Sequence, residues 1–422
     1  MSFSTDTRPE EAAQNRLGAF LTRYRVEGLF LILTLALTVG LYAYAFNRYP
    51  DFIGDYDFHI RLALEMKDTT SLKAAHFLYH AFVILIDTVV PDLSIRTLIF
   101  ISTLTWRAVF ADAIFVLARI TWGRALSIRA GFGLTLVTLC CLVIGPITLA
   151  TWEKGDLYLG YVPLNPLHNP TALVLEPFAL LAAWMAARML FPGPEQVVTP
   201  RETAFTALLI VLSALAKPNY VIALLPAAGV ITADRLWRKQ PVRLKQVIWG
   251  IAIPSVAVLI WQYAFTYMFE PYDYGVPTSD STITLAPFEI MEAFARGSSL
   301  LVLFVSSIVF PTLVYAMYFK DAIRDRFFTL SFVVFLFGAF YTYFLAETGY
   351  RRGHGNFTWS GQIALLIWTI AALFFLVRQN RPYLFGRGPK MQARAVIAYS
   401  ALALHVLSGL LWVALFGNNY WV

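Results

Sequence analysis

The chain has 422 residues, of which 58% are hydrophobic and only 14% are charged, against about 25% charged residues in ordinary soluble domains. Its mean hydropathy is +0.63. These values exclude a disordered chain, a nucleic-acid-binding domain and an ordinary soluble enzyme. Long uncharged stretches such as 28–46 and 131–150 indicate a polytopic membrane protein, so the net charge of +7 is interpreted first as a topology signal.

The apolar stretches predict the membrane-spanning helices. A helix needs about 20 apolar residues to cross a hydrocarbon core of roughly 30 Å. Nine candidates lie at 26–46, 95–118, 129–150, 171–192, 246–269, 297–319, 327–346, 361–378 and 394–416. Two shorter runs, 203–216 and 219–233, are separated by Lys217-Pro218, and we predict a pair of short helices that meet inside the membrane near one face. The fold expected is an all-α transmembrane bundle of about 11 spans.

The segment 76–90 is too short to span and carries His76, His80 and Asp87, so we predict an interfacial or re-entrant helix on the outer face. The N-terminus is then cytoplasmic and the C-terminus outside, which places 21 of the 33 Lys and Arg residues on the inner side. We therefore expect an integral membrane protein, of the bacterial inner membrane, with no nucleic-acid partner. Its chemistry is expected on the outer side, where most acidic residues lie.

The first outer loop concentrates titratable side chains. Asp51, Asp55, Asp57 and His59 fall within nine residues directly after the first predicted span. Clustered carboxylates can raise one another's pKa, which suits a general base, or can hold a divalent cation. The alternative is a hydrated surface loop whose acids cap the following helix, although a cap needs only one Asp.

A second cluster lies between the ninth and tenth predicted spans, at 347–359. Arg351 and Arg352 stand there on the outer side, against the charge bias, and guanidinium groups suit phosphate recognition. Trp359 can stack on a sugar ring, and the same segment offers further substrate contacts from Glu347, His354 and Asn356. The alternative is a glycine-rich turn with interfacial Arg and Trp anchors.

Other outer residues are weaker candidates. Asp156 lies in the segment 152–170, whose His168-Asn169-Pro170 is expected to cap the next span. His76 and His80 share a helical face and could bind zinc with Asp57, but the Glu of an H-E-x-x-H motif is absent, so a divalent metal stays an open alternative and no other cofactor is expected.

Lys217 is the most informative single residue. The 14 residues before it reach only about 21 Å as a helix, so its ammonium is expected below the outer surface. An intramembrane cation is costly unless paired and is a functional candidate by default. No acid lies near it in sequence, so a lipid phosphate is a natural partner. The alternative is a lysine at a helix turn that reaches the interface.

With these residues in view, the chain resembles the type C (GT-C) membrane glycosyltransferases over about residues 26–235. Asp55-Tyr56-Asp57 with His59 is similar to the acidic signature of that family, and 76–80 followed by 91–96 is similar to the segment that joins its juxtamembrane helix to the second span. Leu215-Ala216-Lys217-Pro218-Asn219 resembles the Lys-containing turn of bacterial members. Many members have Asp-Glu where this chain has Asp-Tyr-Asp, which leaves the identity of the base open between Asp55 and Asp57.

The resemblance implies a division of the chain into a cytoplasmic segment (1–25), a GT-C-like module (26–245) with a catalytic first outer loop (47–94) and juxtamembrane helices, and variable C-terminal helices (246–422) with outer loops 270–296 and 347–360. It implies transfer of a sugar from a polyprenyl-phosphate donor to an acceptor hydroxyl of a glycan, lipid or protein at the outer face of a lipid membrane.

In that mechanism Lys217 and one or both of Arg351 and Arg352 bind the donor phosphate. Asp55, or else Asp57, deprotonates the acceptor hydroxyl, and His59 orients either that carboxylate or the acceptor. The remaining outer-loop candidates are substrate contacts: Asp51, His80, Asp156, Glu347, His354, Asn356 and Trp359.

Two alternatives remain. A ligase or polymerase acting on lipid-linked glycans would take a diphosphate donor, and the number of cations near Lys217 separates the two reactions. A transporter or flippase predicts polar residues along a path through the spans, ideally in inverted repeats. The spans contain only scattered candidates and no repeat: Arg107, Asp112, Glu176, Arg188 and His405.

Overall fold

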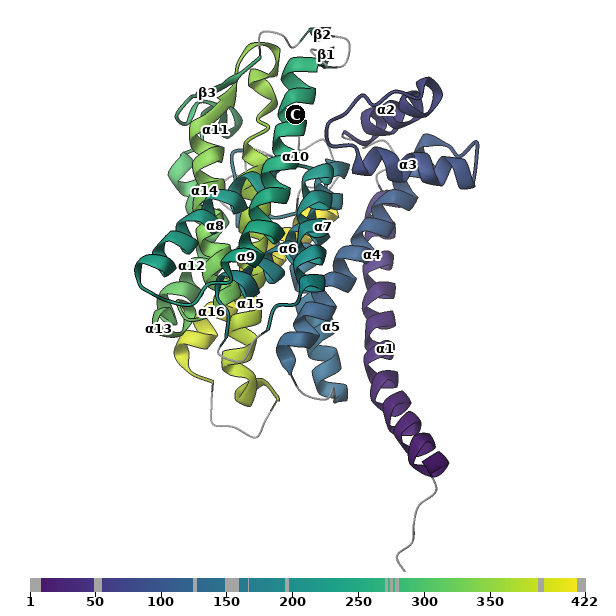
Figure 1. The fold of residues 1–422 in the computed structure, drawn as a ribbon, viewed down its shortest axis with the longest axis vertical. Coiled ribbons are helices and arrows are strands. Elements are labelled where there is room, and N and C mark those ends of the chain that lie inside the picture. The colour runs from purple at the N-terminus through teal and green to yellow at the C-terminus, as the bar shows by residue number, and fades with distance from the viewer. Residues whose placement is uncertain are drawn as a thin grey trace, which may run out of the picture.

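The computed structural model describes residues 9–48, 55–123, 127–148, 159–165, 167–193, 197–269, 272–273, 276–277, 281–385 and 391–415. Within these residues the chain is almost entirely helical (Figure 1). The N-terminal half contains α1 (Pro9–Arg48), α2 (Tyr56–Thr69), α3 (Leu78–Val89), α4 (Ile95–Trp122), α5 (Ile128–Val143), α6 (Pro170–Leu190), α7 (Pro200–Ala216) and α8 (Asn219–Trp237).

The C-terminal half begins with one long helix interrupted by two π turns, which comprises α9 (Leu244–Val247), η3 (Ile248–Ala252), α10 (Ile253–Ala264) and η4 (Phe265–Phe269). The later helices are α11 (Glu289–Ala295), α12 (Leu300–Met317), α13 (Phe319–Ala322), α14 (Arg326–Phe344), the 3₁₀ turn η5 (Gly349–His354), α15 (Thr358–Phe385) and α16 (Ala393–Leu415). Four short strands form two antiparallel pairs, β1 (Tyr272–Asp273) with β2 (Val276–Pro277) and β3 (Ile283–Leu285) with β4 (Leu345–Glu347).

Nine of the described helical segments are long and apolar enough to cross a membrane. This confirms the prediction of an all-α polytopic membrane protein. The two other segments predicted as spans form shorter helices, because α5 has 16 residues and α7 has 17, which reach about 24 Å and 26 Å. The predicted span 129–150 stops early, at Val143, since Gly145-Pro146 cannot continue a helix.

Two other predicted boundaries also differ from the structure. The segment 1–25, predicted as separate from the first span, joins it in a single helix from Pro9 onward. The segment 76–90 forms the 12-residue α3, which lies with α2 across the end of α1 and α4 (Figure 1). Lys67 of α2 and Asp87 of α3 form an ion pair of 2.7 Å that holds these two helices together.

The core is centred on α15, which is buried along nearly its whole length. Glycines let α14 approach it closely, since a Cβ at Gly338 would lie 2.6 Å from the carbonyl oxygen of Ser360. A Cβ at Gly361 would lie 2.4 Å from Thr342 Oγ1. Any larger residue at either glycine would force the two helices apart.

Four of the five polar candidates predicted inside the spans are bonded in the part of the chain that the structure describes, and Asp112 of α4 is the exception. Arg107 of α4 and Glu176 of α6 are fully buried and form an ion pair of 2.9 Å, and Arg107 also donates to Asn165. The neighbouring Arg188 pairs with Glu202 at 2.6 Å. His405 donates from Nδ1 to the carbonyl oxygen of Gly145 and accepts from the amide of Phe310 at Nε2, so this buried ring is bonded on both sides.

Candidate functional site

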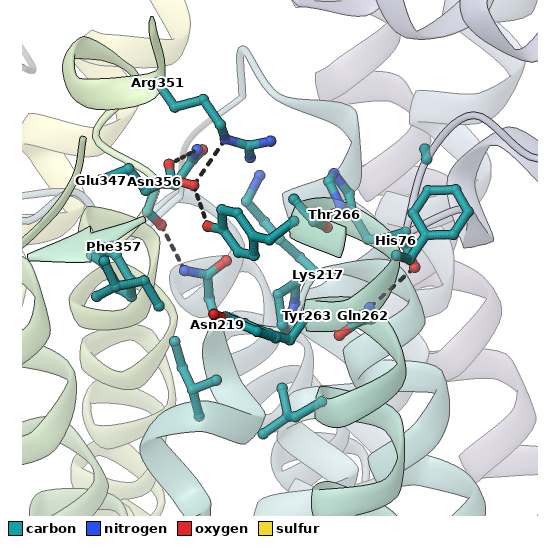
Figure 2. Close-up of a pocket in the computed structure, with 18 of the residues that line it drawn as sticks. His76, Lys217, Asn219, Gln262, Tyr263, Thr266, Glu347, Arg351, Asn356 and Phe357 are labelled. Atoms are coloured by element: carbon teal, nitrogen blue, oxygen red, sulfur yellow. Dashed lines mark hydrogen bonds and ion pairs between the residues drawn. The ribbon is translucent and has the colours of Figure 1, made fainter. Parts of the chain in front are cut away.

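The main cavity has a volume of about 470 Å³ and lies at the end of the molecule where α2 and α3 cross the bundle. Its walls come from the segment before α3, the α7–α8 turn, the end of α10 with η4, and the segment from β4 to the start of α15. Its polar lining residues include His59, His76, His80, Lys217, Asn219, Gln262, Glu347, Arg351 and Asn356. Figure 2 labels all of these except His59 and His80.

Lys217 is fixed by the turn between α7 and α8. Its backbone is extended (φ −167°, ψ 130°) because Pro218 follows it, so α7 ends at Ala216 and α8 begins two residues after Lys217. The side chain is 6% exposed, donates to Thr171 Oγ1 at 3.2 Å, and lies 4.5 Å from the ring centroid of Trp359. No carboxylate among the described residues bonds directly to this ammonium.

Asp55 is connected to Lys217 by a continuous chain of hydrogen bonds. Asn169 donates from Nδ2 to Asp55 Oδ2 at 2.8 Å, and its Oδ1 accepts from the hydroxyl of Thr171 at 2.6 Å. Thr171 in turn accepts from Lys217. The same Asn169 oxygen caps α6 by accepting from the amides of Thr171 and Ala172, which confirms the predicted cap. The N-terminus of α6 thus joins the predicted base to the predicted phosphate ligand.

Glu347 organises the opposite wall of the cavity. It is 4% exposed and forms an ion pair with Arg351 at 2.8 Å, while Tyr267 donates to Oε1 at 2.6 Å and Asn356 donates to Oε2. Asn219 adds a bond to the carbonyl oxygen of Asn356 at 2.7 Å. Figure 2 shows Arg351 and Lys217 pointing toward the same space from different walls. Three donors therefore hold one carboxylate, which fixes the direction of the Arg351 guanidinium.

A histidine pair forms the third part of the site. His59 Nδ1 and His80 Nε2 are 3.0 Å apart, so one neutral ring donates to the other. Burial lowers the pKa of His80 to about 4, and burial together with the neighbouring imidazoles and Lys217 lowers the pKa of His59. Burial likewise lowers the pKa of His168, with Asp55 opposing that shift and Lys217 adding to it. These rings are neutral at pH 7 and contribute hydrogen bonds rather than charge.

Several predicted site residues lie elsewhere. Asp57 pairs with Arg61 at 2.7 Å on the exposed side of α2, outside the cavity lining. Arg352 makes two bonds of 2.6 and 2.7 Å to Glu289, and His354 packs against Tyr350, so neither lines the cavity. Asp51 and Asp156 lie outside the described residues.

Trp359 lies beneath the ammonium of Lys217 and against His168, and its buried position differs from that of an open platform for a sugar. The glycines of the same segment also have a local role. Gly349 and Gly355 adopt φ of 63° and 61°, which bends the backbone at each end of η5.

A metal centre is not formed by the residues predicted for it. No group of three or more His, Cys, Asp or Glu side chains within the described ranges has the arrangement of a metal site. The predicted set of His76, His80 and Asp57 is separated because Asp57 points to Arg61. We therefore assign these histidines to the cavity wall.

The residues that complete the network could not be identified from the sequence. Thr171 and Tyr267 lie inside apolar stretches, and the pairing of Arg107 with Glu176 joins two different helices. Asn169 was expected only as a helix cap, and its second amide bond, to Asp55, depends on the tertiary structure. No protein-family model matches the chain, and no curated protein matches it either.

Proposed function

We propose that the protein is a membrane glycosyltransferase that moves a sugar from a polyprenyl-phosphate donor to an acceptor hydroxyl at the outer face of the membrane. The observation that carries this proposal is the chain of hydrogen bonds from Asp55 through Asn169 and Thr171 to Lys217, which links a carboxylate to a buried cation beside Arg351. Asp55 does not itself line the cavity, and this chain of bonds connects it to the lining cation Lys217. A general base and a phosphate site are the two elements that this transfer needs.

The donor phosphate binds between Lys217 and Arg351. Both side chains line the cavity, and their positive charges stabilise the charge that develops on the departing phosphate. The remaining lining cation, Lys73, already pairs with Glu65, and Arg351 shares its charge with Glu347. Lys217 is thus the cation that no described carboxylate contacts directly, which favours a monophosphate donor over the diphosphate donor of a glycan ligase or polymerase.

Asp55 is the base in this mechanism. Its Oδ2 accepts from Asn169, its side chain is exposed, and Oδ1 is available to an acceptor hydroxyl. Asp57 is paired with Arg61, and Glu347 accepts from three donors. Neither carboxylate is therefore as available to an acceptor as Asp55. The acceptor hydroxyl gives its proton to Asp55 as the hydroxyl oxygen attacks the anomeric carbon. The bond between that carbon and the phosphate oxygen of the donor breaks, and the polyprenyl phosphate leaves.

The polyprenyl chain has an apolar wall to follow. Leu259, Ile260 and Phe265 line the cavity from the helix that contains α10, and Ile260 is 64% exposed on the outer surface of the bundle. The lining therefore continues from buried polar groups to an apolar surface that faces lipid in a membrane. An amphiphile with a phosphate head fits this gradient.

The transport alternative has less support. It depends on a path of unpaired polar groups along the spans. Arg107 pairs with Glu176, Arg188 pairs with Glu202, and His405 bonds to two backbone groups, which leaves Asp112 as the single unbonded candidate among the described residues. We therefore place sugar transfer first.

The test uses the full-length protein in proteoliposomes with radiolabelled polyprenyl-phosphate sugars and an acceptor glycan panel. We expect transfer by the native chain and a loss of at least a hundredfold in Asp55→Asn, within the usual range for a general base. Asp57→Asn is the matched control, since it removes a neighbouring carboxylate that pairs with Arg61 and has no bond to the Asn169–Thr171–Lys217 chain. Full activity in Asp55→Asn would contradict the assignment of Asp55 as the base. If the native protein transfers sugar from none of the tested donor lipids, the proposed function is contradicted.

A further inference from the structure

A second cavity lies at the opposite end of the bundle from the proposed transfer site. Its volume is about 420 Å³, and residues directly after α13 line it, at the end where α13 lies in Figure 1. Other lining residues come from the ends of α4, α6 and α15 and from the first turn of α14. The charge distribution of the sequence predicts that this end is cytoplasmic.

Four arginines from three parts of the chain converge on this cavity: Arg188, Arg324, Arg326 and Arg378. A general excess of basic residues on one membrane face explains why these residues are positively charged. It does not explain why all four line one cavity. The guanidinium of Arg326 packs tightly on the backbone of Gly193, where a Cβ would lie 2.9 Å from Nη2.

The carboxylates described near the cavity are already engaged. Glu202 pairs with Arg188 at 2.6 Å and also closes the capping box of α7. Asp325 pairs with Arg378 and caps α14 by accepting from the amide of Phe328 at 2.8 Å. Arg324 is exposed and has no carboxylate partner among the described residues. The cavity thus offers a planar guanidinium donor group without a fixed anion.

The remaining walls are apolar. Trp184, Phe327, Phe374 and Phe375 supply aromatic faces, and the guanidinium of Arg378 lies 5.8 Å from the ring centroid of Phe375. The small side chains of Ala187 and Ala371 leave the space open. Arginine forks bind phosphate oxygens in pairs, and aromatic walls accommodate the carbon atoms attached to such a group.

We propose that this cavity is a second anion site, which binds the phosphate group of a membrane lipid headgroup or of a soluble phosphate compound. Arg324 contacts the phosphate oxygens, and Arg188, Arg326 and Arg378 form the sides of the site. The site is separate from sugar transfer, because it lies at the other end of the bundle and shares no lining residue with the first cavity.

The experiment measures thermal unfolding of the detergent-purified full chain during titration with phosphatidylglycerol, phosphatidylcholine or inorganic phosphate. The cavity variant is Arg324→Gln/Arg326→Gln, and Arg324→Gln alone is a milder second variant, because its side chain is exposed and pairs with no described carboxylate. The control is Lys239→Gln/Lys245→Gln, which removes the same charge from exposed residues of the same face outside the cavity.

We expect a saturable rise in Tm with phosphatidylglycerol, and an apparent Kd about tenfold higher in the cavity variant but unchanged in the control. A saturable rise with inorganic phosphate and the same dependence on the arginines would support the site and identify a soluble ligand. The proposal is overturned if neither anionic probe stabilises the protein saturably, or if the control variant loses as much affinity as the cavity variant.

Discussion

Replacing Lys217 by Met should separate donor binding from stability. Lys217 is 6% exposed, and the partners of its ammonium are one hydroxyl at 3.2 Å and one indole ring at 4.5 Å. Burial of an ion without a bonded counter-charge costs several kcal/mol in general, whereas the cation–π contact returns about 0.5–2 kcal/mol. Met keeps most of the side-chain volume, so we expect the Tm of the substrate-free protein to stay equal or to rise.

The donor complex should respond in the opposite direction. A hydrogen bond to a charged group is worth about 1.5–3 kcal/mol, so loss of the Lys217–phosphate contact should raise the donor KM by roughly 10- to 150-fold. Initial-rate kinetics with a titrated polyprenyl-phosphate sugar measure this change. Lys73→Met is the matched control, since it removes an ammonium of the same cavity that Glu65 already neutralises, and it should change KM less than about threefold.

The reasoning on Lys217 would be refuted by an unchanged donor KM in Lys217→Met. A fall in Tm together with a loss of activity would also refute it, because the lysine would then be a structural element of the α7–α8 turn.

Three further predictions follow from the described contacts. Asp55→Asn should lower kcat at least a hundredfold with a small change in donor KM, while Asp57→Asn retains activity, and a reversed order in the transfer assay would assign the base to Asp57. Because burial lowers the pKa of His80 to about 4 while an unfolded histidine titrates near 6.5, the unfolded chain binds more protons and stability should fall by about 2 kcal/mol from pH 7 to pH 5. His80→Gln should flatten that dependence in thermal unfolding, and an equal slope would contradict the assignment. Arg107→Met should lower the free energy of unfolding by about 3–5 kcal/mol, and Arg107→Met/Glu176→Met should lower it by much less. If denaturant unfolding shows that the two single losses add, the residues do not act as a buried pair.

The helices could be predicted because their signals are local. Apolar length and charge predict nine long helices, and Pro218 and the pair Gly145-Pro146 mark helix ends. Proline alone is not sufficient, since Pro177, Pro226 and Pro311 lie inside helices. The length of an apolar stretch overestimates the length of the helix at α5. Its predicted span includes seven residues that follow its last helical residue. The helix α1 also begins earlier than expected, since its polar first turns carry good helix formers such as Glu and Ala that a search for apolar residues passes over.

The candidate site could be predicted only in part, because it is assembled from segments far apart in the chain. Lys217 could be predicted as a functional candidate because a charged residue within a long apolar stretch is a local sequence signal. Asp57 and Arg352 have the same chemistry as their neighbours Asp55 and Arg351, and only the tertiary structure pairs them with Arg61 and Glu289 outside the cavity.

The first turns of α6 explain why the proposed base and phosphate site keep a fixed relation. Asn169 and Thr171 join Asp55 to Lys217, and Glu176 lies five residues further along the same helix, about 7.5 Å deeper, where it is paired with Arg107 of α4. A shift of α6 along its axis would break both the buried ion pair and the chain of hydrogen bonds. The free energy lost with the ion pair therefore opposes any movement of Asn169 and Thr171. The buried pair therefore contributes to the proposed chemistry as the anchor of the helix that holds both groups, with no contact to the donor required.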